Sequence, residues 1–318
     1  MREIGGYLAW EPREGVDYYP DLYRFDSIRS ALHFVIKKRH YQKVWIPQYL
    51  CSCIRDTLER IGIAYQYYSI QKNFAPPEDI SLQDGECLFF VNYFGQFSNA
   101  DLLDFAKRYS SVFIDNTHSF FQTPVEKVDT GYTCRKYFGV PDGAYLSTTI
   151  EDREYEQLPF DISYLRMGYI MGRYETDSNT CYKEFAQNDM MFRGVPIKKM
   201  SKLVHNILCG LNFPSIIEKR QNNFLCLHRA LESMNELPVK NHAGLFLYPF
   251  LHENGLELKR FLIAKKIYVP TLWPEVLQTC PEDSWEYRLA SDLVLLPIDH
   301  RYTPEDMQYI LDTLSDLL

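Results

Sequence analysis

Hydrophobic and polar positions along residues 27–115 alternate in blocks that predict helices and strands in turn. Helical spacing of apolar side chains marks some blocks, and short runs rich in Val, Ile, Phe and Tyr mark others. Ser98 begins one predicted helix, with Asp101 at the capping-box position. We expect helices at Ser27–His40, Ser52–Ile61 and Ser98–Tyr109, and strands at Lys43–Pro47, Ile63–Ile70, Cys87–Val91 and Ser111–Ile114.

Strands and helices that alternate at this spacing predict parallel βαβ units. The fold class is therefore α/β, with a mostly parallel central sheet and helices on both of its faces. In such sheets ligands bind outside the carboxyl ends of the strands. The candidate site segments are those that directly follow predicted strands: Pro47–Tyr49, Asn92–Gly95 and Asp115–His118.

The pattern is weaker after residue 150. Residues 151–199 are polar and aromatic without clear periodicity, which leaves open a long excursion or an arm over a partner. Because 318 residues exceed the size at which one core is comfortable, we expect a large domain at 1–225 and a small α+β domain at 226–318. The elements predicted here are helices at Met200–Leu211, Ser215–Met234 and Leu256–Ile267, strands at Leu245–Leu251 and Leu293–Ile298, and a last helix with Thr303 as N-cap, Pro304 at its first position and Asp306 at the capping-box position.

Composition excludes several classes of protein. The net charge is −8 and Lys and Arg are not concentrated anywhere, which argues against nucleic-acid binding. Eight cysteines, with Cys51 and Cys53 close together but no second pair at zinc-like spacing, predict reduced thiols and no metal site. The N-terminus lacks a signal peptide and no apolar run has the length of a membrane span. We therefore expect a soluble cytoplasmic protein without a membrane partner.

Three residue types that suit pyridoxal phosphate follow one another along the chain, the first two within the segment Asp115–His118. Asp115 ends a buried strand, His118 comes three residues later, and Lys136 precedes a glycine turn. A lysine can bind this cofactor covalently, and a carboxylate can keep its ring nitrogen protonated. The helix that begins at Ser27, with Arg29 in its first turn, supplies an N-terminus for the phosphate.

Taken singly, each of these residues has a plainer interpretation. An aspartate after a strand is commonly a turn residue, a nearby histidine is commonly half-buried, and an Arg-Lys pair is usually solvated. Their order, and their place at the ends of predicted strands, favour the cofactor site.

Long segments of the chain resemble fold-type-I pyridoxal-phosphate aminotransferases of the DegT/DnrJ sugar-nucleotide family. The matching segments are KVWIPQYLCSCI, FFVNYFGQFSNADLLDFAKRY, FIDNTHSF, RKYFGVPDGAYL and LVLLPIDHRYTPEDMQYILDTL. The resemblance implies that Lys136 binds the cofactor covalently. It also implies that Asp115 holds the ring nitrogen and that His118 contacts the phenolic oxygen.

The same resemblance assigns further cofactor-binding positions, several of which depart from the family pattern. The phosphate turn, Ser-Gly-Thr in the family, is here Ser27, Ile28 and Arg29, and Thr133 is a substitute source of a hydroxyl. Cys51 stands where the family places the aromatic residue that stacks on the ring. Tyr49 and Tyr93 are candidate replacements for that aromatic residue, and Asn92 replaces a family histidine.

The resemblance implies a homodimeric aminotransferase that moves an amino group from L-glutamate to a keto sugar nucleotide, in polysaccharide or glycoconjugate biosynthesis. The alternative is transamination of a keto acid or another small carbonyl compound, which the changes at Ile28 and Cys51 favour. A non-catalytic scaffold ranks last because Lys136 and Asp115 are both present. The lysine also argues against the related sugar dehydratases, which have a histidine at this position.

Overall fold

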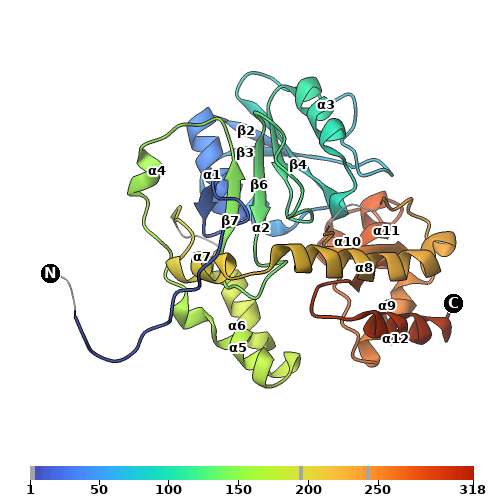
Figure 1. Cartoon of the computed structure of the whole chain (residues 1–318). Helices are drawn as coiled ribbons and strands as arrows, with labels where there is room; N and C mark the ends of the chain where they lie inside the picture. Colours follow the sequence, from blue (N-terminus) through green and yellow to red (C-terminus); the bar gives the residue numbers. More distant parts are fainter. Residues whose placement is uncertain (1–3, 193–195, 241–243) are drawn as a thin grey trace.

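The computed structural model describes residues 4–192, 196–240 and 244–318, and its centre is a mostly parallel sheet (Figure 1). The strand order is β1-β7-β6-β5-β4-β2-β3. Only β7 runs against its neighbours β1 and β6 in this described sheet. The strands are β1 (Tyr23–Phe25), β2 (Lys43–Pro47), β3 (Ala64–Tyr68), β4 (Glu86–Val91), β5 (Val112–Asp115), β6 (Asp129–Thr133) and β7 (Ala144–Ser147).

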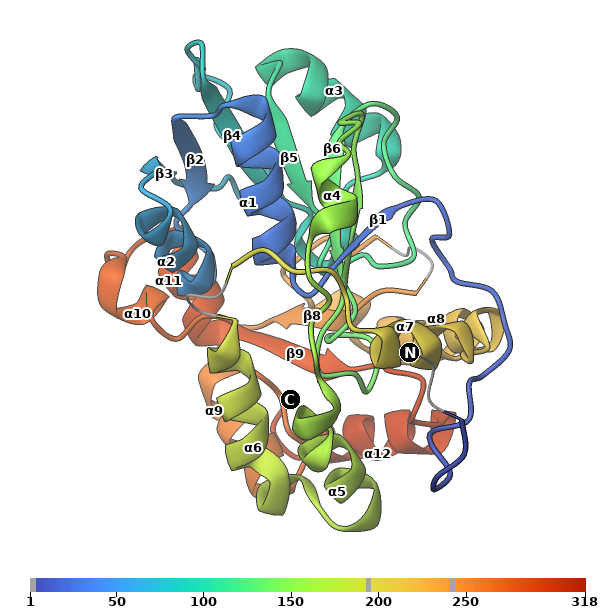
Figure 2. The ribbon, with the colours of Figure 1, turned by 90° about the vertical axis from the view of Figure 1, so that its left-hand side faces the viewer.

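Helices cover both faces of this sheet, and Figures 1 and 2 show α1 and α3 on opposite sides of it. The central strands β4 and β5 are therefore buried and almost wholly apolar, as strands covered on both faces must be. The helices are α1 (Ile28–Arg39), α2 (Ser52–Arg60), α3 (Asn99–Tyr109), α4 (Glu154–Gln157), α5 (Gly168–Glu175), α6 (Ser178–Met191), α7 (Lys202–Cys209), α8 (Phe213–Leu231), α9 (Gly255–Ala264), α10 (Val276–Thr279), α11 (Trp285–Asp292) and α12 (Pro304–Ser315).

The helix starts follow the capping chemistry that the sequence predicts. Ser98 and Asp101 form a reciprocal capping box at the start of α3. Thr303 and Asp306 form another at the start of α12, with Pro304 in the first turn. Both predictions are confirmed, and each box satisfies backbone N–H groups that have no partner within the helix.

A second, two-stranded antiparallel sheet forms in the C-terminal part, from β8 (Leu247–Leu251) and β9 (Leu293–Pro297). It packs with α8, α9 and α12 around its own apolar core. Helix α8 runs from the main sheet into this part (Figure 1). The predicted division at residue 225 lies within α8 and stays a prediction.

Residues 151–199 contain helices that the apolar pattern does not indicate. Helices α5 and α6 pack on each other and project from one end of the molecule (Figures 1 and 2). No residue of α5 is buried, and Asn188 is the buried residue of α6. These helices therefore carry no apolar stripe at helical spacing, which is why the sequence pattern misses them.

Crossing a bilayer requires a long apolar helix, and none of the helices in the described ranges qualifies.

Arg220 of α8 ties the two parts of the chain together. Its side chain is fully buried, and Nη1 donates to the carbonyl oxygens of Leu245 and Phe246 at 2.9 and 3.2 Å. Nη2 donates to the carbonyl of Tyr137 at 3.5 Å, in the segment that follows β6. The C-terminal sheet is thus held against the residues next to Lys136.

The start of α1 lies directly on the sheet because Gly131 of β6 has no side chain. A Cβ at Gly131 would lie 3.0 Å from Ile28 Cδ1 and 2.9 Å from Phe113 Cζ. Ile28 therefore occupies space that any other residue at position 131 would fill. This contact fixes the height of the first turn of α1 above β6.

We expect Gly131→Ala to lower the free energy of unfolding by about 1–3 kcal/mol, because the added methyl group overpacks a buried contact. Urea denaturation of the purified protein measures this change. Gly139→Ala is the matched control, because Gly139 is exposed and its Cβ would meet only Ile170, at 3.3 Å, among the described atoms. Equal stabilities of the two variants would contradict the assigned contact.

Candidate active site

Lys136 lies in a turn just beyond the end of β6. The turn is closed by backbone hydrogen bonds from Tyr137 and Phe138 to the carbonyl of Cys134, at 2.9 and 3.0 Å. The half-buried Lys136 amine lies 5.2 Å from the centre of the Phe246 ring. Burial lowers the pKa of Lys136, and this effect exceeds the opposing influence of Cys51. A lowered pKa increases the fraction of neutral amine, the form that acts as a nucleophile or base.

Asp115 is the last residue of β5 and its side chain is buried. Burial raises the pKa of Asp115 to about 6, although hydrogen bonding by Thr117 and the charge of Lys136 oppose the rise. The backbone N–H of Thr117 donates to Oδ1 at 2.8 Å. The carboxylate is thus oriented but only partly compensated, and a cationic N–H donor would stabilise its charged form.

His118 is buried in a stack of aromatic rings. Its ring lies 5.3 Å from that of Phe94, 5.2 Å from Phe246 and 6.0 Å from Trp273, with interplanar angles of 19°, 17° and 9°. The backbone N–H of Phe94 donates to Nδ1 at 3.4 Å, which places the ring proton on Nε2. Burial lowers the pKa of His118 well below its usual value, so the ring is neutral.

Two residues of this stack have left-handed backbone conformations. Phe94 has φ 52° and Trp273 has φ 60°. Such conformations cost energy in residues with side chains and concentrate at functional sites. The surrounding packing therefore holds both rings against His118.

The predicted phosphate turn begins α1. Ser27 is the N-cap, and its hydroxyl accepts from the backbone N–H of Ser30 at 3.3 Å. The first bond of the helical ladder runs from Ala31 to the carbonyl of Ser27. The N–H groups of Ile28 and Arg29 precede that bond, so they lie where a helix start can bind an anion.

Cys51 is the N-cap of α2, and the backbone N–H of Cys53 donates to its sulfur at 3.4 Å. A hydrogen bond from the Cys53 thiol lowers the pKa of Cys51 to about 7, against the effect of burial. The charges of Lys136 and Arg29 add to this lowering. Cys51 therefore lies within the electrostatic reach of Lys136 and Arg29.

Tyr49 follows β2 and Thr133 ends β6, two strands that β4 and β5 separate in the sheet. Tyr49 is fully buried, and its ring lies 4.7 Å from that of Trp273 and 5.6 Å from that of Tyr93. Its hydroxyl has no hydrogen-bond partner within the described ranges. Thr133 is the buried last residue of β6. The cofactor contacts assigned to both residues stay predictions.

The structure adds residues that the sequence pattern does not indicate. Phe246 and Trp273 come from the C-terminal part and complete the stack around His118. Nothing in the chain near either residue signals this, since both contacts link positions more than a hundred residues apart. In the sequence, Arg135 shows only as the neighbour of Lys136 in a basic pair, which does not indicate a binding role.

A cavity of about 610 Å³ opens beside Lys136. Guanidinium groups and aromatic rings dominate its walls, and α5 and α6 supply much of one side. Its wall includes Arg135, Arg173, Arg220, Arg301, Tyr169, Tyr182, Phe185 and Tyr268. Arg301 pairs with Asp299, which also lines the cavity, and Arg220 donates to backbone carbonyls. Arg135 and Arg173, with the aromatic rings, suit a ligand that has flat groups and an anionic part.

No family model and no curated protein matches the chain. Solved structures do match it. The protein DesV from S. venezuelae, in complex with a ketimine intermediate, is 14% identical with a TM-score of 0.65, over 93% of this chain and 84% of that one. A DegT DnrJ EryC1 StrS aminotransferase from Brucella abortus is 15% identical with a TM-score of 0.61, over 93% and 85%. A candidate sugar aminotransferase from Streptococcus pneumoniae, in its PLP form, is 12% identical with a TM-score of 0.64, over 93% and 86%.

These matches define the class of fold to which the chain belongs. It has the α/β fold of the fold-type-I pyridoxal-phosphate transferases, with a mostly parallel sheet and a small C-terminal α+β part. More particularly, its fold is similar to that of a solved DegT DnrJ EryC1 StrS aminotransferase. The predicted fold class is confirmed.

We expect the buried carboxylate of Asp115 to make stability depend on pH in the cofactor-free protein. Because its pKa is about 6 in the folded state and about 4 in the unfolded chain, its favourable contribution is full below pH 4 and is lost as pH rises through 6. Relative to Asp115→Asn, the wild type should lose on the order of 3 kcal/mol between pH 4 and pH 7. Urea denaturation at several pH values measures the difference.

The matched control is Asp79→Asn, because Asp79 is exposed. Its stability should follow that of the wild type across the same pH range. A difference between wild type and Asp115→Asn that does not change with pH would show that the Asp115 carboxyl is not the group that titrates.

Proposed function

We propose that the protein is a pyridoxal-phosphate-dependent aminotransferase. The observation that carries this proposal is the buried cluster of Asp115, His118 and Lys136 at the carboxyl ends of β5 and β6. The residues fit the cofactor: Asp115 lacks full compensation, Lys136 has a lowered pKa, and Arg29 has buried nitrogens without partners in the described ranges.

Each residue of the cluster has a distinct role in this proposal. The cofactor, when bound, supplies an electron sink for the substrate's bonding electrons. Asp115 holds a proton on the ring nitrogen, and the Nε2 proton of His118 is available for the phenolic oxygen. Lys136 would bind the cofactor covalently. Once the substrate's amino group has replaced it on the cofactor, the released neutral amine of Lys136 would remove a proton from the substrate and return it to the product. The aromatic stack excludes water from the ring.

For the substrates we propose L-glutamate as the amino donor and a keto sugar nucleotide as the acceptor, in polysaccharide or glycoconjugate biosynthesis. The cavity supports this choice because its size and its guanidinium groups suit an acceptor larger and more anionic than a simple keto acid. The second candidate is a small keto acid or another carbonyl compound. Cys51 favours this second candidate, because the N-cap of α2 carries a thiol where the family that the chain resembles has an aromatic ring.

We propose that the working form is a cytoplasmic homodimer. Many large apolar side chains between residues 160 and 191 are exposed in the single chain, which is typical of a surface that a partner covers. They include Phe160, Ile162, Leu165, Met171, Tyr182, Phe185, Met190 and Met191. A non-catalytic scaffold of the same fold ranks last, because Lys136 and Asp115 both lie in the cluster.

The half-reaction with the amino donor tests the enzymatic proposal. Cofactor-loaded protein mixed with L-glutamate alone should release 2-oxoglutarate and lose the visible absorption band of the bound cofactor. Lys136→Ala should lower the rate of this release by at least about a thousandfold, because it removes the amine that moves the proton. Stopped-flow absorbance and quantification of 2-oxoglutarate measure both effects.

A panel of acceptors then separates the two candidate substrates. A keto sugar nucleotide should restore the band under the first proposal, whereas only a small keto acid would restore it under the second. Lys202→Ala is the control for Lys136→Ala, because it removes the amine of an exposed lysine on α7. If no amino acid changes the absorption band at full cofactor occupancy, the aminotransferase proposal fails and only the assignment of the fold stands.

The dimer is tested by sedimentation velocity over micromolar concentrations. The wild type should sediment as a dimer, whereas Ile162→Asp/Leu165→Asp should sediment as a monomer, because two charges replace side chains that are 71% and 78% exposed in the single chain. Tyr309→Asp on α12 is the control, since Tyr309 is also exposed but lies outside this segment. A monomeric wild type would refute the proposed assembly.

A further inference from the structure

Three guanidinium groups surround the ring of Phe192, just beyond the end of α6. The guanidinium carbons of Arg29, Arg135 and Arg166 lie 5.2, 4.5 and 5.2 Å from the ring centre. Three like charges around one buried ring repel one another unless anions compensate them. Whether the cluster can bind a further anion therefore depends on which carboxylates already pair with each arginine.

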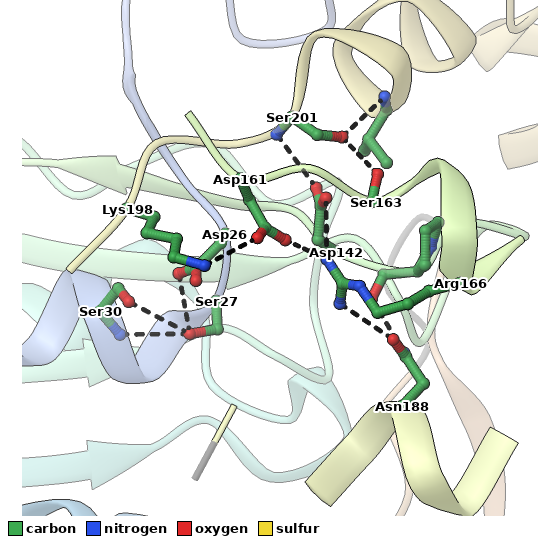
Figure 3. A network of polar contacts seen from close by, with 12 residues as sticks. Asp26, Ser27, Ser30, Asp142, Asp161, Ser163, Arg166, Asn188, Lys198 and Ser201 are labelled. Carbon is green, nitrogen blue, oxygen red and sulfur yellow. Dashed lines mark hydrogen bonds and ion pairs between the residues drawn. The ribbon is translucent and has the colours of Figure 1, made fainter. Parts of the chain in front are cut away.

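Arg166 has its own partners. It pairs with Asp161, donates to Asn188 Oδ1 at 2.9 Å and lies 3.7 Å from Asp142 Oδ2 (Figure 3). Asn188 in turn donates to the carbonyl of Pro141 at 2.9 Å, which attaches α6 to the loop before β7. Arg166 therefore serves to anchor α6.

Arg29 and Arg135 share a single carboxylate, that of Asp189 on α6. Arg135 Nη1 donates to Asp189 Oδ1 at 3.0 Å, and Arg29 Nη2 lies 3.8 Å from the same oxygen. Arg29 is only 4% exposed, yet its Nε and Nη1 have no hydrogen-bond partner in the part of the chain that the structure describes. The Nε of Arg135 is likewise buried without a hydrogen-bond partner in the described ranges. One carboxylate thus faces two guanidinium groups that retain unused donors.

These unused donors lie beside the parts of the site already described. Arg29 is in the first turn of α1, where the backbone N–H groups are free of the helical ladder, and Arg135 directly precedes Lys136. The positive charges of Arg135, Arg29 and Lys136 all act on Asp189 and, against burial, lower its pKa. Asp189 is therefore an anion at the mouth of the predicted phosphate site.

We propose that Asp189 is an exchangeable counterion, which pairs with Arg29 and Arg135 in the cofactor-free protein and is displaced when the phosphate of pyridoxal phosphate binds those two arginines. The inference rests on the proposed function, since it names how this chain binds that cofactor's phosphate. A phosphate dianion carries twice the charge of the carboxylate and can accept from the donors that Asp189 leaves unused.

Two further observations support exchange over a permanent ion pair. The Asp189 side chain keeps 42% of its surface exposed, so it can turn to solvent without being buried unpaired. The two arginines have no such freedom, because Arg29 is buried and Arg135 is largely so. A buried cationic pair stays in place while its exposed partner leaves. In this chain, Arg29 thus compensates for the threonine that the family's phosphate turn provides.

Titration of the cofactor-free protein with pyridoxamine 5′-phosphate and with pyridoxamine tests the inference, because neither compound reacts covalently with Lys136. Calorimetry should show that Asp189→Asn binds the phosphorylated compound roughly tenfold more tightly than the wild type, since the competing anion is gone. Arg29→Gln should bind it at least about tenfold more weakly. The affinity for pyridoxamine should be the same in all these proteins.

The matched control is Glu175→Gln, which removes one negative charge from the exposed end of α5 and should bind like the wild type. A gain in affinity by Asp189→Asn cannot arise from misfolding, so the test remains valid if Arg29→Gln folds poorly. Equal affinities of wild type and Asp189→Asn for pyridoxamine 5′-phosphate would overturn the inference. So would an equal gain for both compounds, because the phosphate would then not be the group recognised.

Inorganic phosphate separates this inference from the proposed function. If Asp189→Asn binds inorganic phosphate more tightly than the wild type while no protein binds the pyridoxamine compounds, the counterion exchange stands and the cofactor assignment fails. If all proteins bind pyridoxamine 5′-phosphate with one affinity, the cofactor assignment stands and the counterion exchange fails.

Discussion

The removal of water from charged groups at one edge of the sheet is the constraint on which the site depends. Asp115 and His118 end up buried because β5 is covered on both faces, and burial disfavours the charged form of each. Lys136, which follows the neighbouring strand β6, has also lost water around its charged form, and this loss lowers its pKa. An amine with a lowered pKa, a neutral imidazole and a partly compensated carboxylate therefore coexist within one cluster. Their chemistry follows from where the strands end, and bound ligand atoms must supply what water no longer can.

The signals that mark these residues in the sequence are local. Asp115 follows an apolar run and Lys136 precedes a glycine turn, so both can be placed at strand ends without knowing the rest of the chain. The fold could be predicted for the same reason, and solved structures at 12–15% identity confirm it. The rest of the site could not be predicted. Asp189 lies on a helix without an apolar stripe, and periodicity reports only helices that bury one face.

Position 28 shows how local and distant residues together determine the start of α1. The sequence shows only an isoleucine where the family that the chain resembles has a glycine. The structure shows why it is accommodated: Gly131, on a strand a hundred residues further on, leaves the space that the isoleucine fills. Arg29 then points its guanidinium group toward Phe192 from a helix start that this contact holds in place. A departure from a motif that looks damaging in one segment is thus balanced by a second segment.

The stack around His118 also sets an order of events for a newly made chain. Phe94 and His118 leave the ribosome early, whereas Phe246 and Trp273 follow after more than a hundred further residues. Until then the imidazole lacks two of the rings that exclude water from it, and Arg220 lacks the carbonyls of Leu245 and Phe246, which directly precede β8. A nascent chain can therefore complete the main sheet before it can close this stack of rings. Under the proposed function, cofactor binding has to wait until Trp273 has been made.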